Sequence, residues 1–330
     1  MRIFLVLLVL TFQLSSTKKL ITVHVIGTAQ GTTYHITYRS VEGLNYKKEI
    51  DSILADLDTS LSTYIPESII SRINKNDSTV YVDHHFVTVF KKSVEVSEKT
   101  KGLFDVTVAP LINAYGFGFT KKAQLDSITI DSLRHLIGYK QVWLKDGKLI
   151  KSRPEVMLDF NAIAQGYSVD VICQFLENKN IRNYVVELGG EVSAKGKNDE
   201  GAYWKVGVDE PSINENRLQT ILSLKNASLA TSGNYKRFYV ENGKRYAHII
   251  DPHTGYPAKH NLLSATVIAP DCMTADAYAT AFIVMGLTKA KEFLKKNKDL
   301  KLEAYFIYDE NGVLKKYTSG NFEETIKPGL

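Results

Sequence analysis

The sequence contains few cysteines for a chain of its length. Its 330 residues include only two, Cys173 and Cys272. A dense disulfide framework is therefore excluded, and the fold must depend on a hydrophobic core. No Cys/His cluster has the ligand spacing of a zinc site. Cys173 falls inside a helical pattern and is expected to be a buried apolar side chain. The sequence leaves open whether the two cysteines form a bridge.

A strong excess of charge of one sign is also missing. Lys and Arg number 41 against 36 Asp and Glu, which gives a net charge of +5 without any dense basic run. This balance argues against nucleic acid as a partner, although it suits an anionic small ligand. Hydrophobic residues make up 44% of the chain and charged residues 23%, so the composition is that of an ordinary globular protein.

Long hydrophobic runs are absent except at the N-terminus. Residues 3–14, IFLVLLVLTFQL, are apolar but shorter than the roughly 20 residues that span a bilayer. With the positive start before them and the small residues after them, they predict an export signal over residues 1–19. The alternative is a buried apolar strand. Thr17 stands where a bacterial lipoprotein signal has Cys, so the sequence does not support a lipid anchor. Residues 20–330 are expected to form a single domain, built of one unit or two tightly packed subdomains.

Hydrophobic periodicity predicts both strands and helices. Strands are expected over residues 21–38 with a break at Gly31, and over 155–160, 183–188, 203–208, 218–224, 236–240, 244–250 and 262–269. Helices are expected over 46–61, 85–99, 131–137, 162–178 and 272–296, the last broken at Gly286. Hairpin turns are expected at Asp146-Gly147, Asn242-Gly243 and Asn311-Gly312. Because strands and helices do not alternate strictly, the pattern favours an α+β fold with mixed and antiparallel sheets and packed helices.

The familiar nucleotide-binding motifs are missing, since there is no P-loop and no GxGxxG after a strand. Two other segments are rich in special residues. Residues 102–118, GLFDVTVAPLINAYGFG, place glycines beside aromatic residues, which lets backbone approach a flat ligand or simply forms a turn. In residues 158–170, LDFNAIAQGYSVD, Asp159 ends an expected strand and Asn161 precedes a helix that it could cap. Such a junction presents backbone groups to a ligand; alternatively, Asp159 is a capping or surface carboxylate.

Two further segments carry candidate acid–base and metal groups. Residues 246–260, YAHIIDPHTGYPAKH, bring His248 near a Thr-Gly turn that could handle a phosphate or a proton. The alternative is an ordinary β-turn beside a core histidine. In residues 272–282, CMTADAYATAF, Asp276 and Thr280 are four residues apart and share one helical face. A carboxylate and a hydroxyl at this spacing suit Mg²⁺, although they can also form a simple hydrogen bond on the helix surface.

Seven segments taken together resemble the ApbE-type flavin transferases, the FAD:protein FMN transferases. They are STYIPESIISRIN, GLFDVTVAPLINAYGFG, LDFNAIAQGYSVD, VVELGGEV, LATSGNY, HIIDPHTG and TADAYATA, in that order. The similarity extends from about residue 28 to residue 287. It implies a two-lobed architecture with the site between the lobes. It also implies an exported, Mg²⁺-dependent enzyme that cleaves FAD, attaches FMN through a phosphoester to a protein Thr or Ser, and releases AMP.

The resemblance also assigns roles to individual residues. It places contacts to the flavin nucleotide at Gln30, Tyr64, Ala114, Tyr115, Gly116, Asp159, Gln165 and Ile250. It places metal contacts at the backbone carbonyl of Ala162 and at Asp276 and Thr280, and it makes His248 the acceptor of the target's hydroxyl proton.

This chain departs from the family pattern at three positions. Gln30 stands where many members have Met, and Gln165 where Lys or Glu is common. Ala279 stands where some members have a second carboxylate. The metal site is then expected to rely on Asp276, Thr280, backbone oxygen, water and the phosphates of the substrate, as Mg²⁺ sites often do.

The resemblance also implies a location and a partner. It places the protein on the periplasmic side of the cytoplasmic membrane. The implied target is a subunit of a membrane redox complex with a Ser/Thr-Gly-Ala-Thr acceptor loop. This chain has no such motif, so self-modification is not expected. Two alternatives remain open: an FAD pyrophosphatase that gives FMN and AMP, and an exported FAD-binding protein without turnover.

Overall fold

The computed structural model describes residues 19–118, 125–209, 218–233, 238–241, 244–247, 249–320 and 326–327. The predicted export signal lies outside these residues except for its last position, and so do the Asn242-Gly243 turn and His248. Among the described helices, none combines the length and the apolar character that a membrane span requires.

An eight-stranded sheet forms the centre of the molecule. Its order is β1 (Ile21–Ala29), β2 (Thr32–Ser40), β5 (Tyr184–Leu188), β6 (Glu191–Lys195), β9 (Ala227–Gly233), β12 (Leu262–Ala269), β13 (Glu303–Glu310) and β14 (Val313–Thr318). All its neighbouring strands pair antiparallel. Three smaller sheets join β3 (Val142–Lys145) to β4 (Lys148–Lys151), β10 (Phe238–Glu241) to β11 (Lys244–Ala247), and β7 (Trp204–Asp209) to β8 (Leu218–Leu224) and β15 (Ile326–Lys327).

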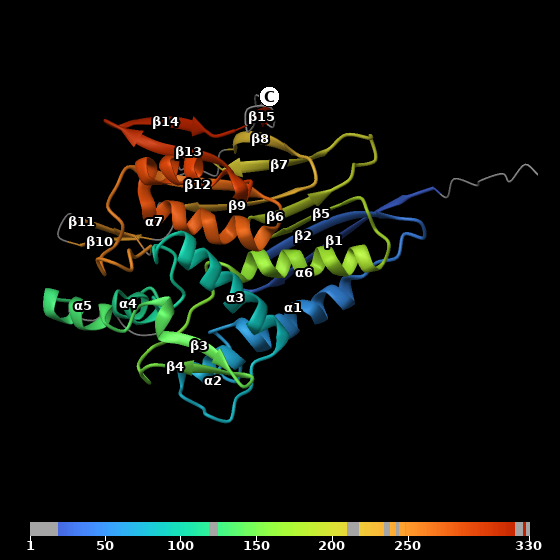
Figure 1. The fold of residues 1–330 in the computed structure, drawn as a ribbon. Helices are drawn as coiled ribbons and strands as arrows, with labels where there is room; N and C mark the ends of the chain where they lie inside the picture. Colours follow the sequence, from blue (N-terminus) through green and yellow to red (C-terminus); the bar gives the residue numbers. More distant parts are fainter. Residues whose placement is uncertain are drawn as a thin grey trace, which may run out of the picture.

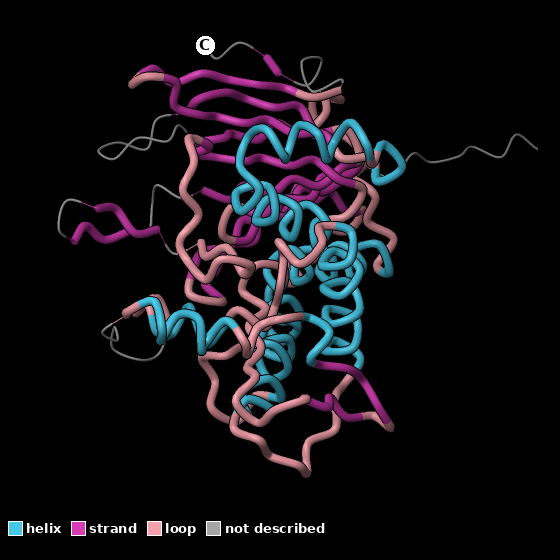
Figure 2. The backbone as a smooth tube through the Cα atoms, turned by 60° about the vertical axis from the view of Figure 1, so that its left-hand side comes forward, coloured by secondary structure: helices cyan, strands magenta, loops and turns pink. Residues whose placement is uncertain are grey.

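Most of the helices lie on one face of the large sheet, as Figures 1 and 2 show. They are α1 (Lys47–Leu61), α2 (Ile69–Asn74), α3 (His84–Lys99), α4 (Ala109–Ala114), α5 (Ser127–Arg134), α6 (Ala164–Asn178) and α7 (Cys272–Lys296). Two short 3₁₀ turns, Tyr139–Gln141 and Lys298–Leu300, complete the described helical elements. Helix α7 packs on β9 and β12 and also against α6, so these two helices connect the sheet to the rest of the helical layer.

The core fills the space between the sheet and these helices. On α7, Phe282 packs edge-to-face against Phe306 of β13, with ring centroids 5.6 Å apart. Beside it, Ile50 of α1 and Ile172 of α6 are buried in one cluster with Ile36 of β2. The apolar periodicity of these segments is therefore satisfied by burial of one face of each element.

The predicted α+β class is confirmed, and most predicted elements are present. The break in the last helix is real, because Gly286 has φ 73° inside α7. A Cβ at this position would lie 2.9 Å from the ring of His260, so a side chain is excluded by both backbone and space. Cys173 is buried in α6 as expected, and both cysteines are free.

Two local predictions are wrong. Residues 155–160 form no strand, because the backbone of Leu158 bonds to the side chain of Asn74 and Asp159 N–H donates to the carbonyl of Val106. The helix predicted over 131–137 instead begins at Ser127 and ends at Arg134. Its start is fixed by Asp126, whose side chain accepts a hydrogen bond from Thr129 N–H. The sequence patterns also overlooked the short helices α2 and α4 and the strands β6 and β9.

Candidate active site

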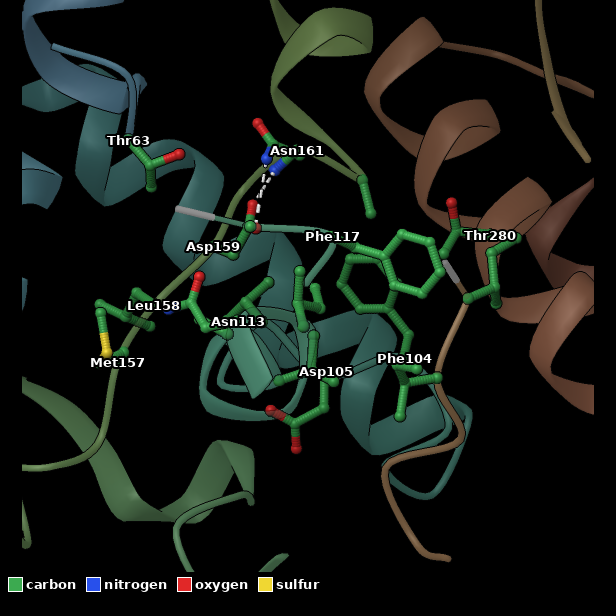
Figure 3. Close-up of a pocket in the computed structure, with 18 of the residues that line it drawn as sticks. Thr63, Phe104, Asp105, Asn113, Phe117, Met157, Leu158, Asp159, Asn161 and Thr280 are labelled. Carbon is green, nitrogen blue, oxygen red and sulfur yellow. Dashed lines mark hydrogen bonds between the residues drawn. The ribbon is translucent and has the colours of Figure 1, made fainter. Parts of the chain in front are cut away.

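A cavity of about 710 Å³ opens between the sheet and the helical layer. The helical side contributes the end of α2, the segment around α4 and residues 157–165. The sheet side, in which we include α7 because this helix packs directly on β9 and β12, contributes the β5–β6 turn, the end of β9 and one face of α7. In the view of Figure 3, Asp159 and Asn161 lie on one side and Thr280 on the other. This volume is typical of a site for a substrate of small-molecule size.

The α7 side of the cavity holds the predicted metal ligands Asp276 and Thr280. Asp276 is 5% exposed, and one of its carboxylate oxygens accepts a hydrogen bond from Gly166 N–H at 3.0 Å. The hydroxyl of Thr280 lies 2.9 Å from that of Ser232 at the end of β9. Burial raises the pKa of Asp276 to about 7, because a low-dielectric surrounding disfavours the charged carboxylate.

The position of Asp276 depends on a close crossing of α6 and α7. Both carboxylate oxygens of Asp170 in α6 accept hydrogen bonds at 2.8 Å from α7, one from Cys272 N–H and the other from Met273 N–H. At the other side of the crossing, a Cβ on Gly166 would lie 2.4 Å from the carbonyl oxygen of Cys272 and 2.8 Å from the Cβ of Asp276. The two helices can therefore approach this closely only with glycine at position 166.

The start of α6 leaves a backbone carbonyl available at Ala162. Ala162 precedes Ile163, the N-cap of α6, so its carbonyl has no partner within the helix, and Gly166 N–H in the first turn donates to Asp276. Within the described residues no hydrogen bond reaches that carbonyl, and Ala162 lines the cavity. The residues present thus fit a hard divalent cation, because they offer a carboxylate, a hydroxyl and an unpaired carbonyl oxygen.

The predicted capping role of Asn161 is wrong. The N-cap of α6 is Ile163, which makes no side-chain capping bond. Asn161 bonds instead to Asp159, whose carboxylate accepts from Asn161 N–H at 2.7 Å and from the Asn161 amide at 3.2 Å. This pair faces the cavity in Figure 3. Burial raises the pKa of Asp159 above its usual value.

Asn74 holds the segment that carries Asp159, although the sequence analysis assigned it no role. Its side-chain amide donates to the carbonyl of Leu158 and accepts from Leu158 N–H, both at 2.8 Å. One side chain therefore satisfies the two backbone groups that a neighbouring strand would otherwise pair. Its place at the end of the segment STYIPESIISRIN was the only sequence signal.

Three of the other predicted flavin contacts also line the cavity. Tyr64 does so with a side chain that is 63% exposed, so its aromatic ring can stack on a flat ligand. Gln165 lies in the first turn of α6, and Ile250 pairs with Pro257 in an isolated β-bridge. The structure thus brings Tyr64, Asp159, Gln165, Ile250 and the three predicted metal contacts, which are far apart in sequence, to one cavity.

The remaining predicted contacts do not line it. Gln30, in the β1–β2 turn, donates a hydrogen bond to the hydroxyl of Ser168 in α6. Ala114, Tyr115 and Gly116 form the end of α4, where Tyr115 is buried and its hydroxyl donates to the carbonyl of Gly255. Their neighbours Asn113, Phe117 and Gly118 face the cavity instead. His248 lies outside the described residues. The binding and catalytic roles assigned to all these residues remain predictions.

Glu191 is a cavity residue that sequence reasoning missed. It begins β6, and its side chain lines the cavity together with Asp276. Burial and the nearby charge of Asp276 raise its pKa well above the usual value for a glutamate. An acid directly after the Gly-Gly turn of VVELGGEV was the available signal. Of the charged residues among the described lining, Lys75 is the one base, against the acids Asp105, Asp159, Glu191 and Asp276.

Comparison with known proteins identifies the family. The ApbE family profile matches residues 30–306. The chain belongs to the ApbE family. It is 37% identical to the FAD:protein FMN transferase of Haemophilus influenzae, over 89% of this chain and 88% of that one. It is 35% identical to that of Vibrio cholerae, over 91% and 92% of the two chains.

Solved ApbE structures have the same fold. The flavin transferase ApbE from Vibrio cholerae superposes with a TM-score of 0.83 at 33% identity, covering 93% of this chain and 100% of that one. The apo form of the Pseudomonas stutzeri flavinyl transferase ApbE gives a TM-score of 0.82 at 28% identity, with 94% and 98% covered. The α+β architecture predicted from the sequence is therefore that of the ApbE family.

The helix crossing yields a stability prediction for Gly166→Ala. Helix propensity alone would make alanine about 1 kcal/mol more favourable. The new methyl group would meet the Cys272 carbonyl, so we expect instead a loss of roughly 1–3 kcal/mol in the free energy of unfolding. Urea denaturation measures the change. Gln174→Ala, on the exposed side of α6, is the matched control and should stay near wild type. A Gly166→Ala protein as stable as the control would show that the crossing tolerates a side chain.

Proposed function

We propose that this protein is an exported, Mg²⁺-dependent FAD:protein FMN transferase. The main support is that one cavity collects residues from separate segments to which the family resemblance assigns flavin and metal contacts. The relatives named above carry this activity in their names, and the chain matches them over most of its length. The proposed FAD site extends from Tyr64 and Asp159 on the helical side to Asp276 on α7.

The charge of the cavity supports a cation-dependent reaction on a diphosphate. The sheet side contributes Glu191 and Asp276, while Lys75 comes from the end of α2 on the helical side. An anionic pyrophosphate would meet uncompensated carboxylates there. Asp276, Thr280 and the carbonyl of Ala162 would hold Mg²⁺, which when bound neutralises charge on the pyrophosphate and its leaving group.

The proposed transfer step is a nucleophilic substitution at the phosphorus of FMN. The acceptor hydroxyl oxygen forms a bond to the FMN phosphorus, and the bond from that phosphorus to the bridging oxygen breaks. AMP departs with the bridging oxygen, and His248 takes the hydroxyl proton. The cavity holds FAD so that the hydroxyl attacks in line with the departing AMP, which requires the acceptor segment to enter the cavity.

We propose a Thr or Ser of a co-exported redox protein as the acceptor. An extended loop with small residues before the Thr, of the Ser/Thr-Gly-Ala-Thr type, would fit because bulky neighbours would be excluded from the cavity. The location on the periplasmic side of the cytoplasmic membrane is part of this proposal. It is supported by the apolar run at residues 3–14 behind a positive start.

One experiment separates this activity from its alternatives. The purified protein is incubated with FAD and Mg²⁺, with and without an acceptor domain that carries such a loop. We expect AMP release that depends on the acceptor, and mass spectrometry should show one FMN phosphoryl group per loop. Replacing the acceptor Thr by Val should abolish labelling, because it removes the nucleophilic oxygen. AMP and FMN without acceptor would mean a hydrolase, and bound FAD without AMP would mean a binding protein.

The metal assignment predicts the effect of Asp276→Ala. This variant removes a carboxylate from the proposed Mg²⁺ site, so AMP release should fall by roughly two orders of magnitude or more. Release of AMP measured over a range of Mg²⁺ concentrations checks this. Asp299→Ala, which removes a largely exposed carboxylate on the surface, is the control and should keep wild-type turnover. Wild-type activity of Asp276→Ala at limiting Mg²⁺ would contradict the assignment.

The proton-transfer role predicts a different result for His248→Ala. If His248 acts only on the acceptor hydroxyl, FAD affinity should be retained while the rate of transfer falls roughly 10²–10⁴-fold. Equilibrium titration with FAD and single-turnover kinetics measure the two quantities separately. A large loss of FAD binding with turnover preserved at saturation would instead make His248 a binding residue.

A further inference from the structure

Glu191 is brought to the cavity by a tight hairpin. Strands β5 and β6 are joined by Gly189 and Gly190, and Leu188 pairs with Glu191 across the hairpin. The two glycines have φ values of 65° and 108°, in the left-handed region that such two-residue turns require. Glu191 is therefore fixed as the first residue of β6, where its side chain lines the same cavity as Asp276.

Its carboxylate is buried without a full set of partners. Glu191 is 8% exposed, and its Oε2 has no hydrogen-bond partner among the described residues. Glu187 on the same hairpin differs, because it accepts from Gly190 N–H at 2.9 Å and pairs with His35 at 2.7 Å. Glu187 therefore stabilises the hairpin, whereas the Oε2 atom of Glu191 makes no hydrogen bond to a described residue. Such a buried oxygen costs free energy unless something binds it.

We propose that Glu191 is the second carboxylate of the divalent-cation site and contacts the cation directly or through a bound water. This inference rests on the proposed function, because the cation is the Mg²⁺ of that site. On α7 itself, Ala279 next to Thr280 is buried in the main hydrophobic cluster and offers no second carboxylate. The hairpin would supply from β6 the negative charge that α7 lacks.

The charges of the cavity lining agree with this arrangement. Glu191 and Asp276 line the same side of the cavity, and two carboxylates gathered there repel each other when both are charged. No basic residue of the described lining comes from the sheet side, where both acids lie. A divalent cation would relieve this repulsion and occupy the unused Oε2.

The test measures cation binding without FAD or acceptor, using Mn²⁺ as the probe in place of Mg²⁺. Electron paramagnetic resonance of free Mn²⁺ gives the dissociation constant for wild type, Glu191→Gln and Glu187→Gln. We expect Glu191→Gln to bind Mn²⁺ about 10- to 100-fold more weakly, the range typical of residues that support a metal site. Glu187→Gln removes the same charge from the same hairpin but outside the cavity lining, so it should stay within about twofold of wild type.

Wild-type affinity of Glu191→Gln would overturn the proposal. An equal loss in both variants would also overturn it, because the effect would then come from the hairpin or from net charge. Circular dichroism checks that Glu191→Gln folds. If it does not fold, anomalous scattering from Mn²⁺ in wild-type crystals decides, and a cation beyond reach of the Glu191 carboxylate and its bound water rejects the proposal. All these readouts are independent of FMN transfer, so a failure of the proposed function would be seen separately, in the AMP assay.

Discussion

The close crossing of α6 and α7 at Gly166 is the contact on which the candidate site depends. Each helix provides a carboxylate that accepts hydrogen bonds from N–H groups at the start of the other. Asp170 of α6 accepts from two N–H groups of α7, and Asp276 of α7 accepts from Gly166 N–H of α6. These N–H donors belong to the first turn of a helix and have no partner within that helix. Ala162 lies just before α6, and its carbonyl has no partner within that helix. The crossing holds this start of α6 against α7, which carries the other two proposed ligands, Asp276 and Thr280.

The sequence predicted the elements well where local periodicity determines them. Strands β1 and β2, helix α1 and the broken helix α7 were all expected, because each buries one face along its length. The cap predicted at Asn161 was wrong because its side chain bonds to Asp159 and the helix starts later, after Ile163. The strand predicted at 155–160 was wrong for another reason, because the backbone of Leu158 is satisfied by Asn74, 84 residues earlier, and the start of α6 is likewise bonded to Asp276, 110 residues later than Gly166. No local pattern reveals such partners.

The candidate site, too, was predicted only in part from the sequence. Family motifs pointed to Tyr64, Asp159, Gln165 and Asp276, and the fold brings them to one cavity although they come from three separate segments. Glu191 was missed even though its segment was recognised, because its significance lies in sharing a cavity with Asp276 and not in its neighbours along the chain. A buried acid is ordinary in sequence. It becomes informative only when the structure shows that an oxygen has no partner.

The exposed Tyr64 and the buried acids divide the cavity into two regions with different physical demands. The exposed ring of Tyr64 is a surface on which a flat aromatic ligand can stack. The two buried carboxylates have the opposite requirement, because burial disfavours the charged form of each. Binding of a cation to the folded state alone would then stabilise the fold as well as prepare the site. Placing the second acid on β6 is consistent with the packing of α7, because the apolar surroundings of Ala279 would leave a carboxylate there without partners. The hydrophobic core and the candidate metal site thus share one helix, with the face around Asp276 and Thr280 turned to the cavity and the neighbouring face kept apolar.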